Sequence, residues 1–135
     1  MGFVKSLQAV LPKLTTNTSV VLYSTVAVKV GMPFHASVAA SKGALEGLSK
    51  SLAAELAPKT RVNVIAPSIT NTPLADRFLN NEAKMEKSAQ RHPLKRVGEA
   101  DDIAAMPRFL ISDESRWMTG QILGLDGGMS PLHTH

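Results

Sequence analysis

Two short apolar runs separated by a long helical segment constrain the fold of this chain more than any other feature. Residues 19–23 and 61–66 are rich in valine, leucine and isoleucine, as expected of strands buried on both faces. Between them, residues 38–57 repeat leucine at spacings of three and four, which lines one face of an α-helix. Strand, helix and strand in this order predict two parallel strands joined by a crossover helix.

The other segments extend this alternation. Amphipathic helices are predicted over residues 3–14 and 99–112, the second with Pro107 inside it, which should kink it. A less regular helical region covers residues 74–91, and residues 120–128 predict a short strand followed by a tight glycine turn. We therefore expect an α/β fold with a parallel sheet of about three strands and flanking helices.

Composition excludes several classes of function. With 135 residues, 44% of them apolar, the chain suits one domain over residues 1–135. It has no cysteine, which excludes disulfides and thiol catalysis and fits the reducing cytoplasm. The net charge of +4 comes without a basic run among aromatic residues, so we expect no nucleic-acid partner. No apolar run approaches the roughly 20 residues that cross a membrane. His92, His133 and His135 lack metal-ligand spacing, so we expect no metal.

The helix over residues 38–57 carries a second line made of very small residues. Ala39, Gly43 and Gly47 are spaced four apart on one face. Each glycine inside a helix costs roughly 1 kcal/mol relative to alanine, so two of them predict that another backbone packs close. Lys42 lies beside this line in the first turns, where the helix dipole disfavours a cation. It is either a surface lysine or a charge placed for a function.

Four segments together carry a resemblance to a known family. They are Tyr23-Ser24-Thr25, Ala40-Ser41-Lys42-Gly43-Ala44-Leu45, Val62-Asn63-Val64-Ile65-Ala66-Pro67-Ser68, and Thr119-Gly120-Gln121 with Asp126-Gly127-Gly128. In this order and at these separations, the chain resembles the C-terminal half of a short-chain dehydrogenase/reductase along essentially its whole length. The resemblance implies a truncated Rossmann-like sheet and hydride transfer between NAD or NADP and an alcohol or carbonyl substrate.

The resemblance also implies a site built around a tyrosine and a lysine four positions apart. Lys42 matches the lysine, which in the family holds the nicotinamide ribose and lowers the tyrosine pKa. Val38 occupies the tyrosine position and has no proton to transfer. Thr25 lies thirteen positions earlier, where the family has a serine that orients the substrate oxygen, and its hydroxyl could still donate. Ser24 is expected to point to the other side of the strand.

The loop after the second strand contacts the nicotinamide amide and the cofactor phosphates in the family. Pro67, Ile69 and Thr72 match it and are the predicted cofactor contacts beside Lys42. Ser68 stands where the family usually has glycine and is expected to disturb a backbone conformation that glycine makes easy. The sequence holds no glycine-rich phosphate-binding turn, which the N-terminal half of the family supplies. We therefore expect dinucleotide binding by this chain alone to be weak or absent.

Two residues are alternatives to the missing tyrosine. Tyr23 shares a strand face with Thr25, although we favour a tyrosine packed under a helix. His35 precedes the long helix without a visible orienting partner, so we expect a loop histidine. A working enzyme that uses either residue therefore ranks below two other hypotheses. These are half of an oxidoreductase weakened by Val38, and a non-catalytic module for oligomerisation or partner binding.

A sheet of three strands has consequences for assembly. The strand over residues 19–23 would be an edge with unpaired backbone groups. The resemblance places a subunit interface on the helices over 1–14 and 38–57. We therefore expect a homo-oligomer formed through these helices, and a small alcohol or carbonyl compound as the substrate if the chain is active.

Overall fold

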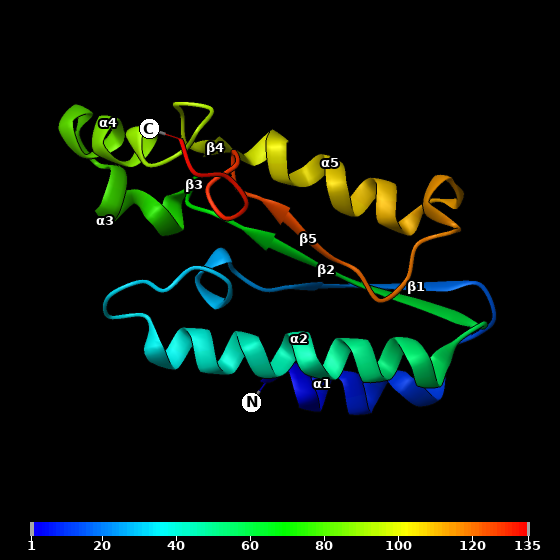
Figure 1. Ribbon diagram of the computed structural model, residues 1–135. Helices are drawn as coiled ribbons and strands as arrows, with labels where there is room; N and C mark the ends of the chain where they lie inside the picture. Colours follow the sequence, from blue (N-terminus) through cyan, green and yellow to red (C-terminus); the bar gives the residue numbers. More distant parts are fainter. Residues whose placement is uncertain (1, 135) are drawn as a thin grey trace.

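A three-stranded parallel sheet forms the centre of the computed structural model, which describes residues 2–134 (Figure 1). The strands are β1 (Thr18–Tyr23), β2 (Thr60–Pro67) and β5 (Ile122–Leu125). Their order is β1–β2–β5, with Tyr23 opposite Ile65 and Pro67 opposite Leu125. The predicted α/β class with three parallel strands is confirmed.

Helices cover both faces of this sheet (Figure 1). On one side lie α1 (Gly2–Val10) and α2 (Ala36–Leu56), and on the other lies α5 (Ala100–Ile111). These bounds agree closely with the predicted helices, and α5 continues through Pro107 to Ile111. None of the helices within residues 2–134 combines the length and the apolar character that a bilayer span requires.

A second, small sheet lies near the carboxyl ends of these strands and was not predicted. β3 (Thr70–Asn71) pairs in parallel with β4 (Gly98–Glu99). Between them the predicted helical region divides into two helices, α3 (Asp76–Leu79) and α4 (Glu82–Gln90). The break has a local cause, because the Asn81 side chain accepts a hydrogen bond from the Lys84 N–H at 2.8 Å and so caps a new helix.

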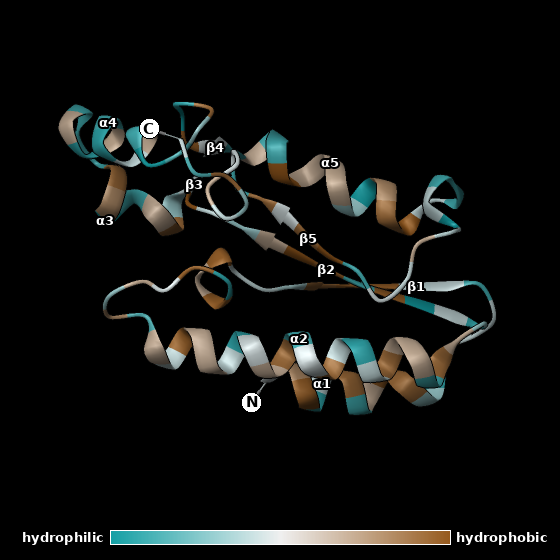
Figure 2. Ribbon diagram, viewed as in Figure 1, coloured by the Kyte–Doolittle hydropathy of each residue, from teal (hydrophilic) through white to brown (hydrophobic). Residues whose placement is uncertain are grey.

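The central strand β2 contributes more buried apolar residues than any other strand or helix. Val62, Val64 and Ile65 are almost fully buried, and Val62 packs with Leu52 and Ala53 of α2. The brown stretches along the strands in Figure 2 follow this core. Polar groups in the same strand are satisfied by the chain that leads into β5. The Asn63 amide donates to the Met118 carbonyl and accepts from the Gln121 N–H, both at 3.1 Å.

The small-residue line of α2 has no backbone packed against it within residues 2–134. A Cβ built on Gly43 would meet only the Val28 side chain at 3.7 Å, and one built on Gly47 would meet nothing within 4 Å. The prediction of a closely packed backbone is therefore wrong for the described part of this chain. The predicted edge is confirmed, since β1 pairs only with β2 in the sheet.

Candidate functional site

The predicted site residues gather at the carboxyl ends of the parallel strands. Ser24 and Thr25 follow β1, Ser68 and Ile69 follow β2, and Asp126 follows β5. Since parallel strands end at the same edge of a sheet, the three segments lie along one edge of the domain (Figure 1). This is the edge at which open α/β sheets bind their ligands.

Lys42 reaches this edge from α2. Its ammonium Nζ donates a hydrogen bond of 2.9 Å to the backbone carbonyl of Tyr23, the last residue of β1. Val38 lies one helical turn earlier on the same face of α2, and its side chain is 47% exposed. The structure thus places the residue at the tyrosine position in the first turn of α2, open to solvent and one turn from Lys42.

The two hydroxyls after β1 have different partners. Thr25 is the N-cap of a 3-10 turn over Val26–Val28, and its Oγ1 accepts from the Ala27 N–H at 3.3 Å. The threonine O–H proton remains available for donation. Ser24 is buried and donates to a carboxylate oxygen of Glu46 on α2. Within residues 2–134, the Ser24 hydroxyl is thus occupied as a donor, whereas the Thr25 hydroxyl donates to no protein group.

The side chains of Tyr23 and His35, the two alternatives to the missing tyrosine, make no hydrogen bond to the side chain of Lys42 or Thr25 within residues 2–134. The Tyr23 side chain is 42% exposed, so the expectation that it packs under a helix is not met. His35 is exposed and stands at the N-cap of α2, as expected of a loop histidine, but its Nδ1 has a partner that was not expected, the Pro33 carbonyl at 2.7 Å.

The loop over residues 67–72 is held on both sides. The Ser68 N–H donates to the Leu125 carbonyl at 3.1 Å, and the Gly98 N–H donates to the Ile69 carbonyl at 3.2 Å. These bonds tie the loop to β5 and to β4. The predicted contacts Pro67, Ile69 and Thr72 are all half-buried, so each keeps some surface for a ligand.

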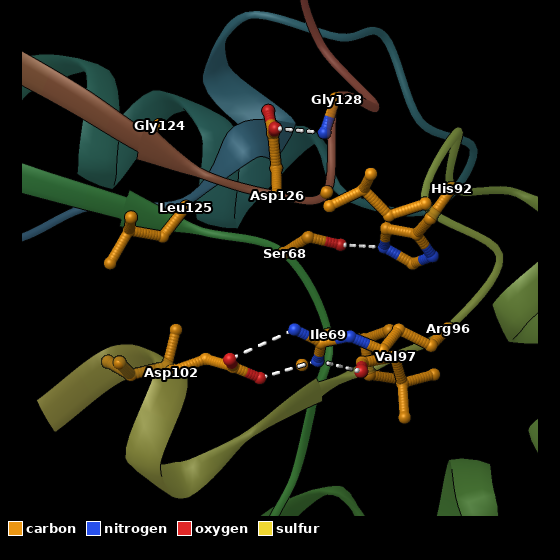
Figure 3. A pocket seen from close by; sticks show the side chains of 14 residues that line it. Ser68, Ile69, His92, Arg96, Val97, Asp102, Gly124, Leu125, Asp126 and Gly128 are labelled. Carbon is orange, nitrogen blue, oxygen red and sulfur yellow. Dashed lines mark hydrogen bonds and ion pairs between the residues drawn. The ribbon is translucent and has the colours of Figure 1, made fainter. Parts of the chain in front are cut away.

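Beside this loop lies a pocket of about 310 Å³ (Figure 3). It is lined by Ser68, Ile69, His92, Leu94, Arg96, Val97, Gly98, Asp102, Ile103, Gly124, Leu125, Asp126, Gly127 and Gly128.

The glycine turn is shaped by Asp126, whose carboxylate accepts from the Gly128 and Ser130 N–H groups at 2.9 and 3.1 Å. Gly128 has φ +86°, and a Cβ there would lie 2.9 Å from a Leu132 methyl carbon, so the turn requires glycine.

Sequence reasoning considered His92 only as a metal ligand and did not place it beside Ser68 in this pocket. His92 is only 2% exposed, and its Nε2 lies 2.5 Å from Ser68 Oγ (Figure 3). The two residues are 24 positions apart in loops without periodicity, so no local pattern links them. The one available signal was Ser68 itself, a hydroxyl at a position where glycine is expected. In residues 2–134, no group of three or more His, Asp or Glu could hold a metal ion.

An ion pair closes another wall of the pocket. The two terminal guanidinium nitrogens of Arg96, Nη1 and Nη2, donate to the Asp102 carboxylate, at 2.5 and 3.0 Å (Figure 3). Asp102 also accepts from the Glu99 N–H at 2.7 Å and so completes the capping box of α5. The pKa of Asp102 is lowered from 3.8 to about 2. The main cause is the hydrogen bond from the Arg96 side chain, and the second is the hydrogen bond from the Glu99 backbone N–H.

We expect an NMR titration of the Asp102 carboxyl carbon to show this lowered pKa of about 2. Because the pKa is depressed on folding, the ion pair stabilises the fold above the ordinary value of 3.8 and is lost as pH falls through about 2. Arg96→Gln should move the pKa back toward 3.8, whereas Arg91→Gln should not. A midpoint that is the same in both variants would contradict the assignment.

Comparison with known proteins places this geometry in a family. The family model described as "Enoyl-(Acyl carrier protein) reductase" matches residues 1–130. A 3-oxoacyl-(acyl-carrier-protein) reductase of Thermotoga maritima is 40% identical over 114 residues, which are 84% of this chain and 46% of that protein. The chain thus spans about half the length of the curated relatives it matches.

Solved structures of dehydrogenases superpose on this chain and support the same family assignment. The aldohexose dehydrogenase of Thermoplasma acidophilum superposes with a TM-score of 0.89 at 29% identity, over 99% of this chain and 58% of that one. A gluconate 5-dehydrogenase of Burkholderia cenocepacia, in complex with NADP and tartrate, gives 0.85 at 28% identity, over 94% and 51%. The chain belongs to the short-chain dehydrogenase/reductase family.

Proposed function

We propose that this chain supplies the nicotinamide-facing half of an NAD- or NADP-dependent oxidoreductase that acts on an alcohol or carbonyl group. One observation carries the proposal: the Lys42 ammonium is held at the carboxyl end of β1 by its 2.9 Å hydrogen bond to Tyr23. An ammonium has three donors, so two remain for the hydroxyls of a ribose. When bound, the nicotinamide would supply or accept the hydride.

Each of the other residues has a defined role in this proposal. The free O–H of Thr25 donates to the substrate oxygen and orients it. Pro67, Ile69 and Thr72 border the nicotinamide from the loop that β4 and β5 hold in place. The described residues fit this end of the cofactor, whereas the sequence offers no glycine-rich turn for its phosphates. We infer that binding by these residues alone is weak.

Proton transfer is the step that this chain lacks. A tyrosine at position 38 would lie one turn from the Lys42 ammonium, whose positive charge favours the ionised phenol. Val38 supplies neither an acid nor a base, and within residues 2–134 neither the Tyr23 phenol nor the His35 ring is hydrogen-bonded to the side chain of Lys42. We therefore infer that the chain as it stands is weakly active or inactive in hydride transfer.

A second candidate function is a non-catalytic module for oligomerisation or partner binding. Val38 favours it, and so does the open small-residue line of α2, where Gly47 faces free space. The two candidates differ in whether the chain binds a nicotinamide at all.

Calorimetry should separate them. We expect weak, saturable binding of at least one of NAD⁺, NADH, NADP⁺ and NADPH, and binding of nicotinamide mononucleotide, which lacks the adenosine half. Lys42→Met should weaken each of these interactions, because it removes the ribose donors. Lys50→Met, an exposed lysine further along α2, is the matched control and should not. Absence of binding by all five compounds would favour the module over the oxidoreductase.

We also propose that the chain self-associates through α1 and α2. Both helices lie on the same side of the sheet, and much of α1 is apolar (Figure 2). We expect light scattering coupled to size exclusion to show a dimer or larger species. Gly47→Glu should weaken association by placing like charges at the interface, whereas Ala104→Glu on exposed α5 surface should not. A well-folded monomer would contradict this proposal.

A further inference from the structure

A serine–histidine pair in the pocket has no role in the oxidoreductase chemistry. We propose that Ser68 and His92 act as nucleophile and general base, and that they hydrolyse small uncharged carboxylic esters through an acyl-serine intermediate. The reaction needs no nicotinamide, so this proposal goes beyond the function described above and is independent of it.

The two partners of His92 fix its tautomer. Nδ1 lies 2.8 Å from the Ser88 carbonyl oxygen, which can only accept, so Nδ1 carries the proton. Nε2 is then the unprotonated nitrogen, and Ser68 Oγ donates to it over 2.5 Å. The Met129 sulfur lies 3.6 Å from the same oxygen and is a weaker acceptor. An imidazole in this state takes the proton of a hydroxyl nucleophile, and the backbone carbonyl takes the orienting place that a carboxylate has in a triad.

The surroundings hold the base in place and leave the nucleophile accessible. His92 is only 2% exposed, whereas Ser68 is half-buried, and both line the pocket of about 310 Å³ (Figure 3). This volume lies at the lower end of ligand pockets, roughly 300–1,000 Å³, which suits a short acyl group.

The lining of the pocket favours an uncharged ester. Its apolar residues are Ile69, Leu94, Val97, Ile103 and Leu125. The Asp126 carboxylate in the wall disfavours an anionic substrate, and the cation in the wall, Arg96, is paired with Asp102.

A donor for the developing oxyanion follows the nucleophile directly. Ile69 lines the pocket, and within residues 2–134 its N–H makes no hydrogen bond to the protein. The N–H of the residue after the nucleophile is one of the two oxyanion donors in α/β-hydrolases. Such a donor stabilises the negative charge that appears on the carbonyl oxygen in the transition state.

The chemistry balances with water as the only co-reactant. Ser68 Oγ forms a bond to the ester carbonyl carbon while its proton moves to His92 Nε2. The alcohol leaves with that proton when the carbon–oxygen bond of the ester breaks. Water then attacks the acyl-serine and gives a proton to Nε2, which returns it to Ser68 Oγ as the carboxylic acid departs.

Covalent labelling of the unmodified chain is the first test. Diisopropyl fluorophosphate should modify the chain once, and mass spectrometry should place the adduct on the tryptic peptide 62–77, in which Ser68 is the only serine. Adduct formation elsewhere, or none, would overturn the proposal. This result does not depend on how any variant folds.

Hydrolysis of p-nitrophenyl acetate is the second test. We expect Ser68→Ala and His92→Gln to lower the rate by about 100-fold or more, the usual contribution of a placed acid–base group. Ser51→Ala and His133→Gln change exposed residues outside the pocket, so they control for hydrolysis by surface groups and should match the unmodified chain. Circular dichroism checks that each variant is folded. A folded Ser68→Ala protein that retains the full rate would overturn the proposal.

Discussion

Val38→Tyr is expected to raise the rate of NAD(P)H-dependent ketone reduction by about 10²- to 10⁴-fold, the range that a placed general acid contributes. Val38 lies in the first turn of α2 with 47% of its side chain exposed, so a larger ring meets solvent rather than core. The new hydroxyl would lie on the Lys42 face of the helix. Lys42 would favour its ionisation, which catalysis near neutral pH requires.

Val38→Phe is the matched control, because it adds the same ring without the acid. The rate is followed by NAD(P)H absorbance over a panel of small ketones, at a cofactor concentration that saturates the binding measured by calorimetry. Adding Lys42→Met to Val38→Tyr should remove most of the gain. Equal rates for Val38→Tyr and Val38→Phe would show that this position does not carry proton transfer here.

The sheet and its long helices could be predicted because their patterns are local and strong. The strand runs over 19–23 and 61–66 each became a strand within one residue at either end, and the helix over 38–57 became α2. Burial on both faces gives β2 the apolar residues Val62, Val64, Ile65 and Ala66, and that signal is readable in a single segment.

The predictions that failed depended on contacts between segments. β3 and β4 have two residues each, too few for an alternating pattern to be visible. Whether the Tyr23 side chain is buried depends on which segment packs against the edge strand β1, and the residues of β1 alone do not determine that segment. The same holds for Gly47: the pattern of α2 does not tell whether another segment packs on it, and in the structure nothing lies within 4 Å of a Cβ built there.

The candidate site also contains residues that could be assigned from the sequence and a contact that could not. Lys42 could be assigned to the site because the resemblance matches it to the family lysine, and in the structure its ammonium lies at the carboxyl end of β1. The Ser68–His92 contact could not, because it joins two loops whose approach is set by the paired β3 and β4 and by the Asp126 turn. Residues in loops held together by tertiary contacts leave no periodic trace in the sequence.

The layer formed by α5 rests on a single fully buried leucine. Leu110 is 0% exposed, and the next residue, Ile111, is 63% exposed. We expect Leu110→Ala to lower the free energy of unfolding by about 2–5 kcal/mol, because it removes buried methyl groups and leaves a cavity. Ile111→Ala should cost much less, since its side chain is already largely in water. Urea unfolding followed by circular dichroism measures both, and the midpoint should fall without a change in slope.

This pair of variants also separates two ways in which α5 is held. The Leu110 carbonyl accepts from the Ser19 hydroxyl at 2.6 Å and from the Arg61 guanidinium at 3.1 Å, and the alanine variant keeps both bonds. A loss below about 1 kcal/mol, within the range of one hydrogen bond, would mean that these carbonyl contacts, rather than the apolar face, anchor the helix. A loss in the expected range assigns the anchor to packing, because domains of this kind have only about 5–15 kcal/mol of stability in total. The position of α5, and with it the Arg96–Asp102 wall of the pocket, would then depend chiefly on the packing of its apolar face, in which Leu110 is the buried residue.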